Sequence, residues 1–169
     1  MRHAKPLTLH AVVLTSGLGL ALAAGAATAK DPPKPDPAVT AQLDAAEMQY
    51  EVDEEGDYRM VFEMEDKRTQ IVFLRAPVET FGRRRIREVW APAYRAAGEG
   101  RIPAEVANRL LDATMANKIG AWASEGDVAV FVVKIDADAS ADELRETIEA
   151  AANTADAMEN ELTPGKDDF

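Results

Sequence analysis

The pattern of apolar and polar positions is clearest in the C-terminal third of the chain. There two strand-like runs, Ile119–Ser124 and Val128–Ile135, flank the connection Glu125–Asp127. The middle residue of the connection is Gly126, which adopts a positive φ at little cost, so the pattern predicts a β-hairpin. The second run is almost continuous Val, Ala, Phe and Ile, which is typical of a strand covered on at least one face. We expect this hairpin to carry the fold.

A helix is predicted on each side of the hairpin. Pro103 suits the first position of the preceding helix, which is expected to continue to residue 117. The following helix begins with a capping box, Ser140 to Glu143, in which two side chains satisfy free backbone amides. Both helices carry apolar residues at helical spacing. The predicted inner stripes are Val106, Leu110, Leu111 and Met115 in the first helix, and Leu144, Ile148, Ala151, Ala155, Met158 and Leu162 in the second.

The N-terminal half of the domain has shorter elements. Apolar residues at helical spacing predict a short helix that is capped by Thr40 and ends at Glu47. Strand patterns follow at Gln49–Val52, Tyr58–Met64 and Thr69–Arg75, with polar turn residues between them. Because one hairpin follows another, we expect an antiparallel sheet.

A further strand is expected at Arg84–Trp90, and Pro92 should end it because proline cannot donate to a strand ladder. The element order is then α-β-β-β(-β)-α-β-β-α. This order predicts an α+β fold of two layers, with helices packed on an antiparallel sheet. We assign a single domain to residues 38–163 and expect a flexible tail at residues 164–169, because Pro164-Gly165 ends the last helix.

Residues 1–29 have the pattern of a secretory signal peptide. A short basic region with Arg2 and Lys5 precedes the apolar stretch Ala11–Ala27, and a small-residue cleavage pattern ends at Ala29. The apolar stretch is short for a membrane span. The Pro-rich, charged residues 30–37 predict a flexible leader between the cleavage site and the domain.

Composition narrows the compartment and the partners. Removal of the signal peptide changes the formal net charge from −11 to about −13. Nucleic acid and anionic membranes repel such a chain, so we expect neither as a partner, and no stable membrane insertion. The absence of cysteine fits export without disulfides. High alanine content and more arginine than lysine are typical of a GC-rich bacterial genome. Together with the signal-peptide pattern, this suggests a periplasmic or secreted protein of a Gram-negative bacterium.

The usual catalytic and metal-binding residue types are missing from the predicted mature chain. Both histidines, His3 and His10, lie in the signal peptide, and cysteine is absent, so imidazole or thiol catalysis and a usual zinc site are excluded. Asp53–Asp57 superficially resembles a calcium loop, but it lacks the ligand spacing of such loops and indicates a solvated turn. We therefore expect no enzyme activity, no cofactor and no bound metal.

One segment departs from the acidic background, because Gly82–Arg87 contains four arginines. One interpretation is a solvated edge strand whose charge prevents edge-to-edge pairing. The other is a contact for an acidic partner segment, or for an acidic surface of a second copy. The sequence is equally consistent with Trp90 in the core and with Trp90 at an interface, whereas Trp122 is assigned to the core. The candidate protein-interaction residues are Arg83, Arg84, Arg85, Arg87, Trp90 and Tyr94.

Three segments resemble the YbjN family: Tyr50–Leu74, Ile86–Tyr94, and Leu110–Trp122 with the hairpin after it. The resemblance lies in the pattern of apolar and turn positions and covers nearly the whole mature domain. It implies a small non-enzymatic α+β domain with a fold like that of type III secretion chaperones, which often dimerises and binds other polypeptides. The family is described as regulators of sensory transduction and offers no established site residues. The signal peptide departs from the cytosolic members and argues against a cytosolic or type III secretion role.

We therefore expect an exported, non-enzymatic protein-binding, chaperone-like or regulatory domain that forms a homodimer and binds a protein partner. Its function is expected at Arg83–Tyr94, across the molecule from Lys118–Ile135. Two alternatives remain open. One is a periplasmic hydrolase that uses carboxylates, and the other is a carrier of a small apolar ligand in a pocket between sheet and helices.

Overall fold

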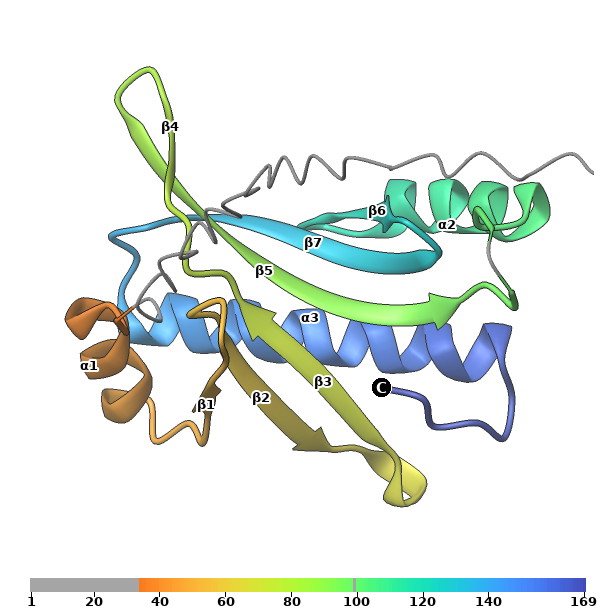
Figure 1. Cartoon of the computed structure of the whole chain (residues 1–169), viewed down its shortest axis with the longest axis horizontal. Coiled ribbons are helices and arrows are strands. Elements are labelled where there is room, and N and C mark those ends of the chain that lie inside the picture. The colour runs from red at the N-terminus through yellow and green to blue at the C-terminus, as the bar shows by residue number, and fades with distance from the viewer. Residues whose placement is uncertain (1–33, 99) are drawn as a thin grey trace, which may run out of the picture. The chain divides into compact units, whose positions relative to one another are not determined.

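The computed structural model describes residues 34–98 and 100–169, which form an antiparallel sheet with helices on one face (Figure 1). This arrangement confirms the predicted α+β class. The predicted signal peptide, residues 1–29, and the leader residues 30–33 lie outside the described residues. The helices are α1 Pro37–Ala45, α2 Ala104–Ala116 and α3 Ala141–Leu162, and a short 3-10 turn spans Glu65–Lys67. The strands are β1 Glu51–Val52, β2 Tyr58–Glu63, β3 Thr69–Leu74, β4 Glu79–Phe81, β5 Arg84–Arg95, β6 Ala121–Glu125 and β7 Val128–Asp136.

The strands lie in the order β1-β2-β3-β5-β7-β6, and β4 pairs with the start of β5. The central strand β5 pairs with β7 from Ile86–Asp136 to Arg95–Val128. The prediction that Arg83–Tyr94 lies across the molecule from the β6–β7 hairpin is therefore wrong, since β5 and β7 are direct neighbours. The long, apolar β7 lies inside the sheet between β5 and β6, and the shorter β6 is left at the edge, where short strands limit edge-to-edge pairing.

Strand β5 is longer than predicted, because Pro92 does not end it. The strand continues to Arg95, with a register shift against β7 just after Pro92. The Pro92 carbonyl accepts a 2.8 Å hydrogen bond from the Gln70 side chain of β3. In an antiparallel sheet, the backbone nitrogen and carbonyl of one residue point toward the same neighbouring strand. The Pro92 nitrogen therefore faces β3. The pairing of β3 with β5 has already ended there, at Phe73–Trp90. The missing N–H therefore costs no ladder bond.

Helix α3 covers one face of the sheet and packs against β3, β5 and β7. Its predicted stripe is confirmed, because the apolar residues from Leu144 to Met158 are buried and Leu162 is half-buried. The alanines in the middle of the stripe allow the helix to approach the strands closely. The predicted capping box is also confirmed, since Ser140 and Glu143 exchange side-chain to backbone hydrogen bonds.

Helix α1 begins earlier than predicted. Asp36 is its N-cap and accepts a 3.0 Å hydrogen bond from the Ala38 N–H, and Pro37 occupies the first turn, where a missing N–H is harmless. The predicted cap, Thr40, therefore lies inside the helix. The Tyr58 hydroxyl donates to the Asp36 carbonyl at 3.0 Å, so the end of the predicted flexible leader belongs to the fold.

The predicted inner stripe of α2 is only half correct. Leu110 is buried and Val106 is partly buried, but Leu111 is 62% exposed and Met115 is 88% exposed. At 100° per residue, Leu111 and Met115 lie on a different side of the helix from the other two residues. Helix α2 packs through one narrow side, beside β6, and an ion pair links it to α3. Its outer apolar residues are left at the surface.

Candidate functional site

Strands β4 and β5 form a hairpin that projects beyond the rest of the sheet (Figure 1). Its turn is Gly82-Arg83, and Gly82 has a φ of +63°, as expected at the first central position of a type II′ turn. Phe81 is 76% exposed, and Arg83 and Arg84 are exposed beside it. The hairpin therefore presents one aromatic ring and two guanidinium groups to the solvent.

The other two arginines of the predicted cluster have acidic partners in the fold. Arg85 pairs with Asp138 at 2.5 Å at the surface. Arg87 is 3% exposed, and its guanidinium bonds to the Asp36 carboxylate at 2.9 Å and to two backbone carbonyls just after β3. The hydrogen bond from Ala38, with a further contribution from Arg87, holds the pKa of Asp36 below its ordinary value. Arg87 is therefore a structural residue that a partner cannot reach.

The edge-strand interpretation is wrong for Arg85 and Arg87, because β5 is bonded on both sides at these positions. Arg83 lies in the turn of the hairpin, and at Arg84 only the short strand β4 pairs with β5. At this outer end the edge-strand interpretation stays a prediction.

Trp90 and Tyr94 lie on opposite faces of β5. Trp90 pairs with Val132 on the face away from the helices, whereas Tyr94 pairs with Ala129 and packs against the core. Regular alternation would place residues four apart on one face. The register shift after Pro92 inserts one residue and reverses the alternation. The six predicted interaction residues therefore do not form one patch.

The face of the sheet away from the helices carries an apolar patch around Trp90. The Trp90 indole N–H donates to Glu88 at 2.8 Å, and the guanidinium carbon of Arg75 lies 4.6 Å from the ring centre. A cavity of about 450 Å³ lies on this face. Its apolar lining residues include Ile71, Phe73, Trp90, Pro92, Val130 and Phe169.

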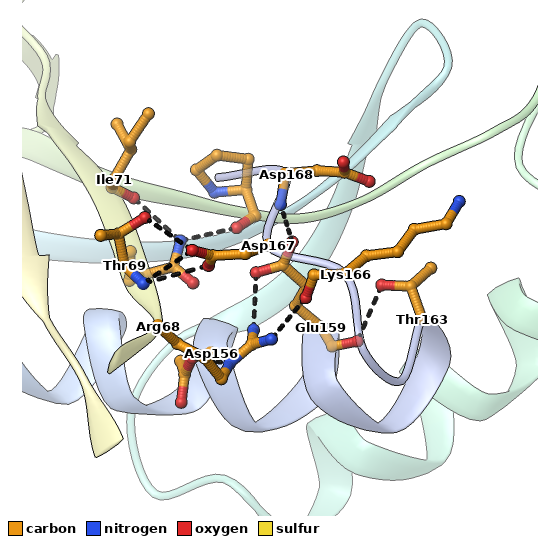
Figure 2. Close-up of polar contacts among 11 residues, drawn as sticks. Arg68, Thr69, Ile71, Asp156, Glu159, Thr163, Lys166, Asp167 and Asp168 are labelled. Atoms are coloured by element: carbon orange, nitrogen blue, oxygen red, sulfur yellow. Dashed lines mark hydrogen bonds and ion pairs between the residues drawn. The ribbon is translucent and has the colours of Figure 1, made fainter. Parts of the chain in front are cut away.

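The sequence predicts a flexible tail at residues 164–169, but the structure holds residues 166–169 against β3 (Figure 2). The Asp167 carboxylate accepts hydrogen bonds from the Thr69 N–H at 3.0 Å and from the Thr69 hydroxyl at 3.2 Å. The Asp168 N–H donates to Glu159 at 2.7 Å, and Phe169 is only 7% exposed. The prediction fails because β3 diverges from β5 here, which leaves β3 backbone groups available to this segment.

Arg68 connects the 166–169 segment with α3. Its guanidinium bonds to Asp156 at 2.7 Å, to Glu159 at 2.9 Å and to the Lys166 carbonyl at 2.5 Å (Figure 2). Burial raises the pKa of Glu159, whereas the hydrogen bond from Asp168 and the charge of Arg68 offset part of this effect. The cluster joins the start of β3 to α3 and to the segment that follows α3, which are about 90 residues away in sequence.

The buried acids do not form the pair that a carboxylate hydrolase would need. Among the described residues, the buried carboxylates are those of Asp57 and Glu159. Asp57 pairs with Arg75 at 2.8 Å beside one end of β3, and Glu159 pairs with Arg68 beside the other end. Each of these two acids has its own arginine, and the length of a strand separates them, so Asp57 and Glu159 do not form a pair. Asp156 lies nearer to Glu159, but Arg68 bonds to both of these carboxylates.

A second cavity, of about 270 Å³, lies between α2 and β6 and is lined by Ile102, Leu110 and Trp122. It is smaller than usual small-molecule pockets, which span about 300–1,000 Å³. The assignment of Trp122 to the core is confirmed, since its ring packs on Phe131 with the centroids 5.2 Å apart.

In the acidic turn, the Asp53 carboxylate accepts hydrogen bonds from two N–H groups of its own turn. Within residues 34–98 and 100–169, no group of His, Cys, Asp and Glu side chains is arranged to hold a metal ion. In the same part of the chain, no helix combines the length and apolar character needed to cross a membrane.

Three residues of these surfaces are absent from the sequence-based candidates: Phe81, Arg68 and Phe169. Phe81 was detectable in principle, because an aromatic residue directly before Gly82-Arg83 is the last strand position before a hairpin turn. Arg68 and Phe169 have no local pattern. Their partners are distant in sequence, so only the fold shows what they contact.

The fold and its surfaces define a small α+β domain with helices on one face of the sheet and an apolar patch on the other. The family model of YbjN, described as "Putative bacterial sensory transduction regulator", matches residues 35–164. The chain belongs to the YbjN family. The description names a regulator and no reaction. A search of curated proteins finds no match to the chain.

The different roles of the arginines can be tested by stability. Arg87→Ala should lower the free energy of unfolding by about 2 kcal/mol, because it leaves two backbone carbonyls without their charged donor. Arg83→Ala is the matched control and should change stability by less than about 0.5 kcal/mol, since Arg83 is exposed. Urea unfolding measures both variants. Equal losses would contradict the structural role of Arg87.

Proposed function

We propose that this chain is an exported, non-enzymatic regulatory domain that acts by binding another protein, and that it works as a dimer. Membership of a family described as regulators supports the regulatory part. The signal-peptide pattern of residues 1–29 supports export. The observation that carries the binding role is the projecting β4–β5 hairpin, with its exposed aromatic ring and its two exposed arginines.

The hairpin is suited to contact because it is rigid and chemically distinct. Its turn has two residues, and β5 continues from it into the centre of the sheet, so little conformational freedom is lost on binding. Phe81, Arg83 and Arg84 are of residue types that are enriched at interfaces. In a chain of net charge −11, these arginines favour a partner with an acidic segment beside an apolar site.

The hairpin can be tested by charge reversal. The double variant Arg83→Glu/Arg84→Glu should lose its protein partner in capture from periplasmic extract, measured by quantitative mass spectrometry, because like charges then face the partner. The double variant Arg101→Glu/Lys118→Glu makes the same change in net charge at two other exposed positions and should retain the partner. Loss in both variants, or in neither, would reject the hairpin as the contact.

Dimerisation is assigned to the outer side of α2, where Leu111 and Met115 are exposed. Light scattering coupled to size exclusion should give a dimer for the unmodified chain at high micromolar concentration. Leu111→Ser/Met115→Ser should shift it to the monomer, because it removes the apolar contact. Val61→Ser, at an apolar position of β2 that is 49% exposed, should leave the dimer unchanged. A strict monomer for the unmodified chain would exclude the dimer.

Export can be tested by the mass of the protein recovered from the periplasm. Cleavage after Ala29 should give a chain that begins at Lys30. A protein that keeps residues 1–29, or that is found only in the cytosol, would contradict export.

A further inference from the structure

The 166–169 segment lies where the central sheet opens. Strands β3 and β5 pair at Phe73–Trp90 and Leu74–Val89 and then separate. The buried side chain of Gln70 bridges the opening by donating to the Pro92 carbonyl at 2.8 Å and to the carbonyl of Ile71 at 3.0 Å. Beyond this bridge, the Thr69 N–H of β3 bonds to Asp167 instead of to β5.

The bound segment is recognised through both its backbone and its charges. Arg68 donates to the Lys166 carbonyl, and Glu159 accepts the Asp168 N–H (Figure 2). The Asp167 carboxylate binds the N–H and the hydroxyl of Thr69. These contacts come from the start of β3 and from α3, and they resemble the way a groove holds an extended peptide.

The aromatic end of the segment is buried on the apolar face of the sheet. Phe169 is 7% exposed, and the guanidinium carbon of Arg95 lies 5.6 Å from its ring centre. The same ring lines the cavity of about 450 Å³ that also contains Trp90 and Pro92. An aromatic anchor in a pocket beside a basic side chain is a common arrangement at protein–peptide interfaces.

We propose that this opening is a peptide-binding site for an acidic segment followed by an aromatic residue, and that the chain's own residues 166–169 occupy it until a partner displaces them. The inference rests on the proposed protein-binding function and adds a second contact, with its own ligand chemistry. The occupant is argued from the segment that is seated there, whose Asp167 and Phe169 make the two side-chain contacts.

Exchange is compatible with the fold because the segment is joined to α3 by a short turn. The turn includes Pro164 and Gly165 and follows Leu162, the last residue of α3, so α3 does not have to move when residues 166–169 leave the opening. A tethered ligand with so short a linker has an effective concentration on the order of millimolar. An external peptide of the same sequence therefore binds weakly until the tethered copy is weakened.

The experiment uses the full chain and a fluorescein-labelled peptide, Gly-Lys-Asp-Asp-Phe, with binding followed by fluorescence anisotropy. Phe169→Ser should bind the peptide at least about tenfold more tightly than the unmodified chain, because the tethered competitor has lost its anchor. Ile119→Ser, the control at an apolar position that is 46% exposed and distant from the opening in sequence, should behave like the unmodified chain. A peptide that ends in Ser instead of Phe should not bind.

A second variant tests the inference in case Phe169→Ser does not fold. Asp167→Asn keeps Phe169 but weakens the bond to Thr69, and it should also raise peptide affinity, by less than Phe169→Ser. Thermal unfolding by circular dichroism checks each variant. The inference is overturned if no folded variant gains affinity, or if all variants bind the peptide equally. Either result would leave the charge-reversal test of the β4–β5 hairpin unaffected, so failure here is distinct from failure of the proposed function.

Discussion

The structure depends on the unequal pairing of β5 with its two neighbours. On one side it is bonded to β7 along most of its length, and this pair carries the buried residues against which α3 packs. On the other side its pairing with β3 ends after two residue pairs. Because Pro92 and the register shift follow directly, β3 turns away, and the opening receives Gln70, the Arg68 cluster and Phe169. The long β5–β7 pair thus forms the basis of the core, and the short β3–β5 pair leaves the opening that receives residues 166–169.

The sequence predicts the parts of the fold whose information is local. The capping box and the apolar stripe of α3 are clear because a helix repeats its pattern over many turns, and the β6–β7 hairpin is clear because a glycine turn separates two apolar runs. The placement of β5 beside β7 was not predictable in this way, since pairing between distant strands leaves no local pattern. The prediction that Pro92 ends β5 was wrong for a related reason. Whether proline breaks a strand depends on which neighbour its nitrogen faces.

The candidate site was predictable only in part. The arginine cluster drew attention to the correct hairpin, but the sequence could not separate exposed Arg83 and Arg84 from buried Arg87, because the partner of Arg87 is the N-cap of α1. Trp90 and Tyr94 seemed to form one surface until the register shift placed them on opposite faces. Residues 166–169 look like a polar end in the sequence, and only the divergence of β3 from β5 gives them a binding place.

The two tryptophans of the chain lie on opposite faces of one sheet. Trp122 is packed on Phe131 in the core, while Trp90 is half-buried on the other face beneath the Arg75 guanidinium. The intrinsic fluorescence of the protein therefore contains two separate reporters. Trp122 emits from the apolar interior and follows unfolding of the domain, whereas Trp90 emits beside the cavity that Phe169 lines and is sensitive to whatever occupies that face. Replacing either one by phenylalanine would let the remaining signal be assigned to one layer of the molecule.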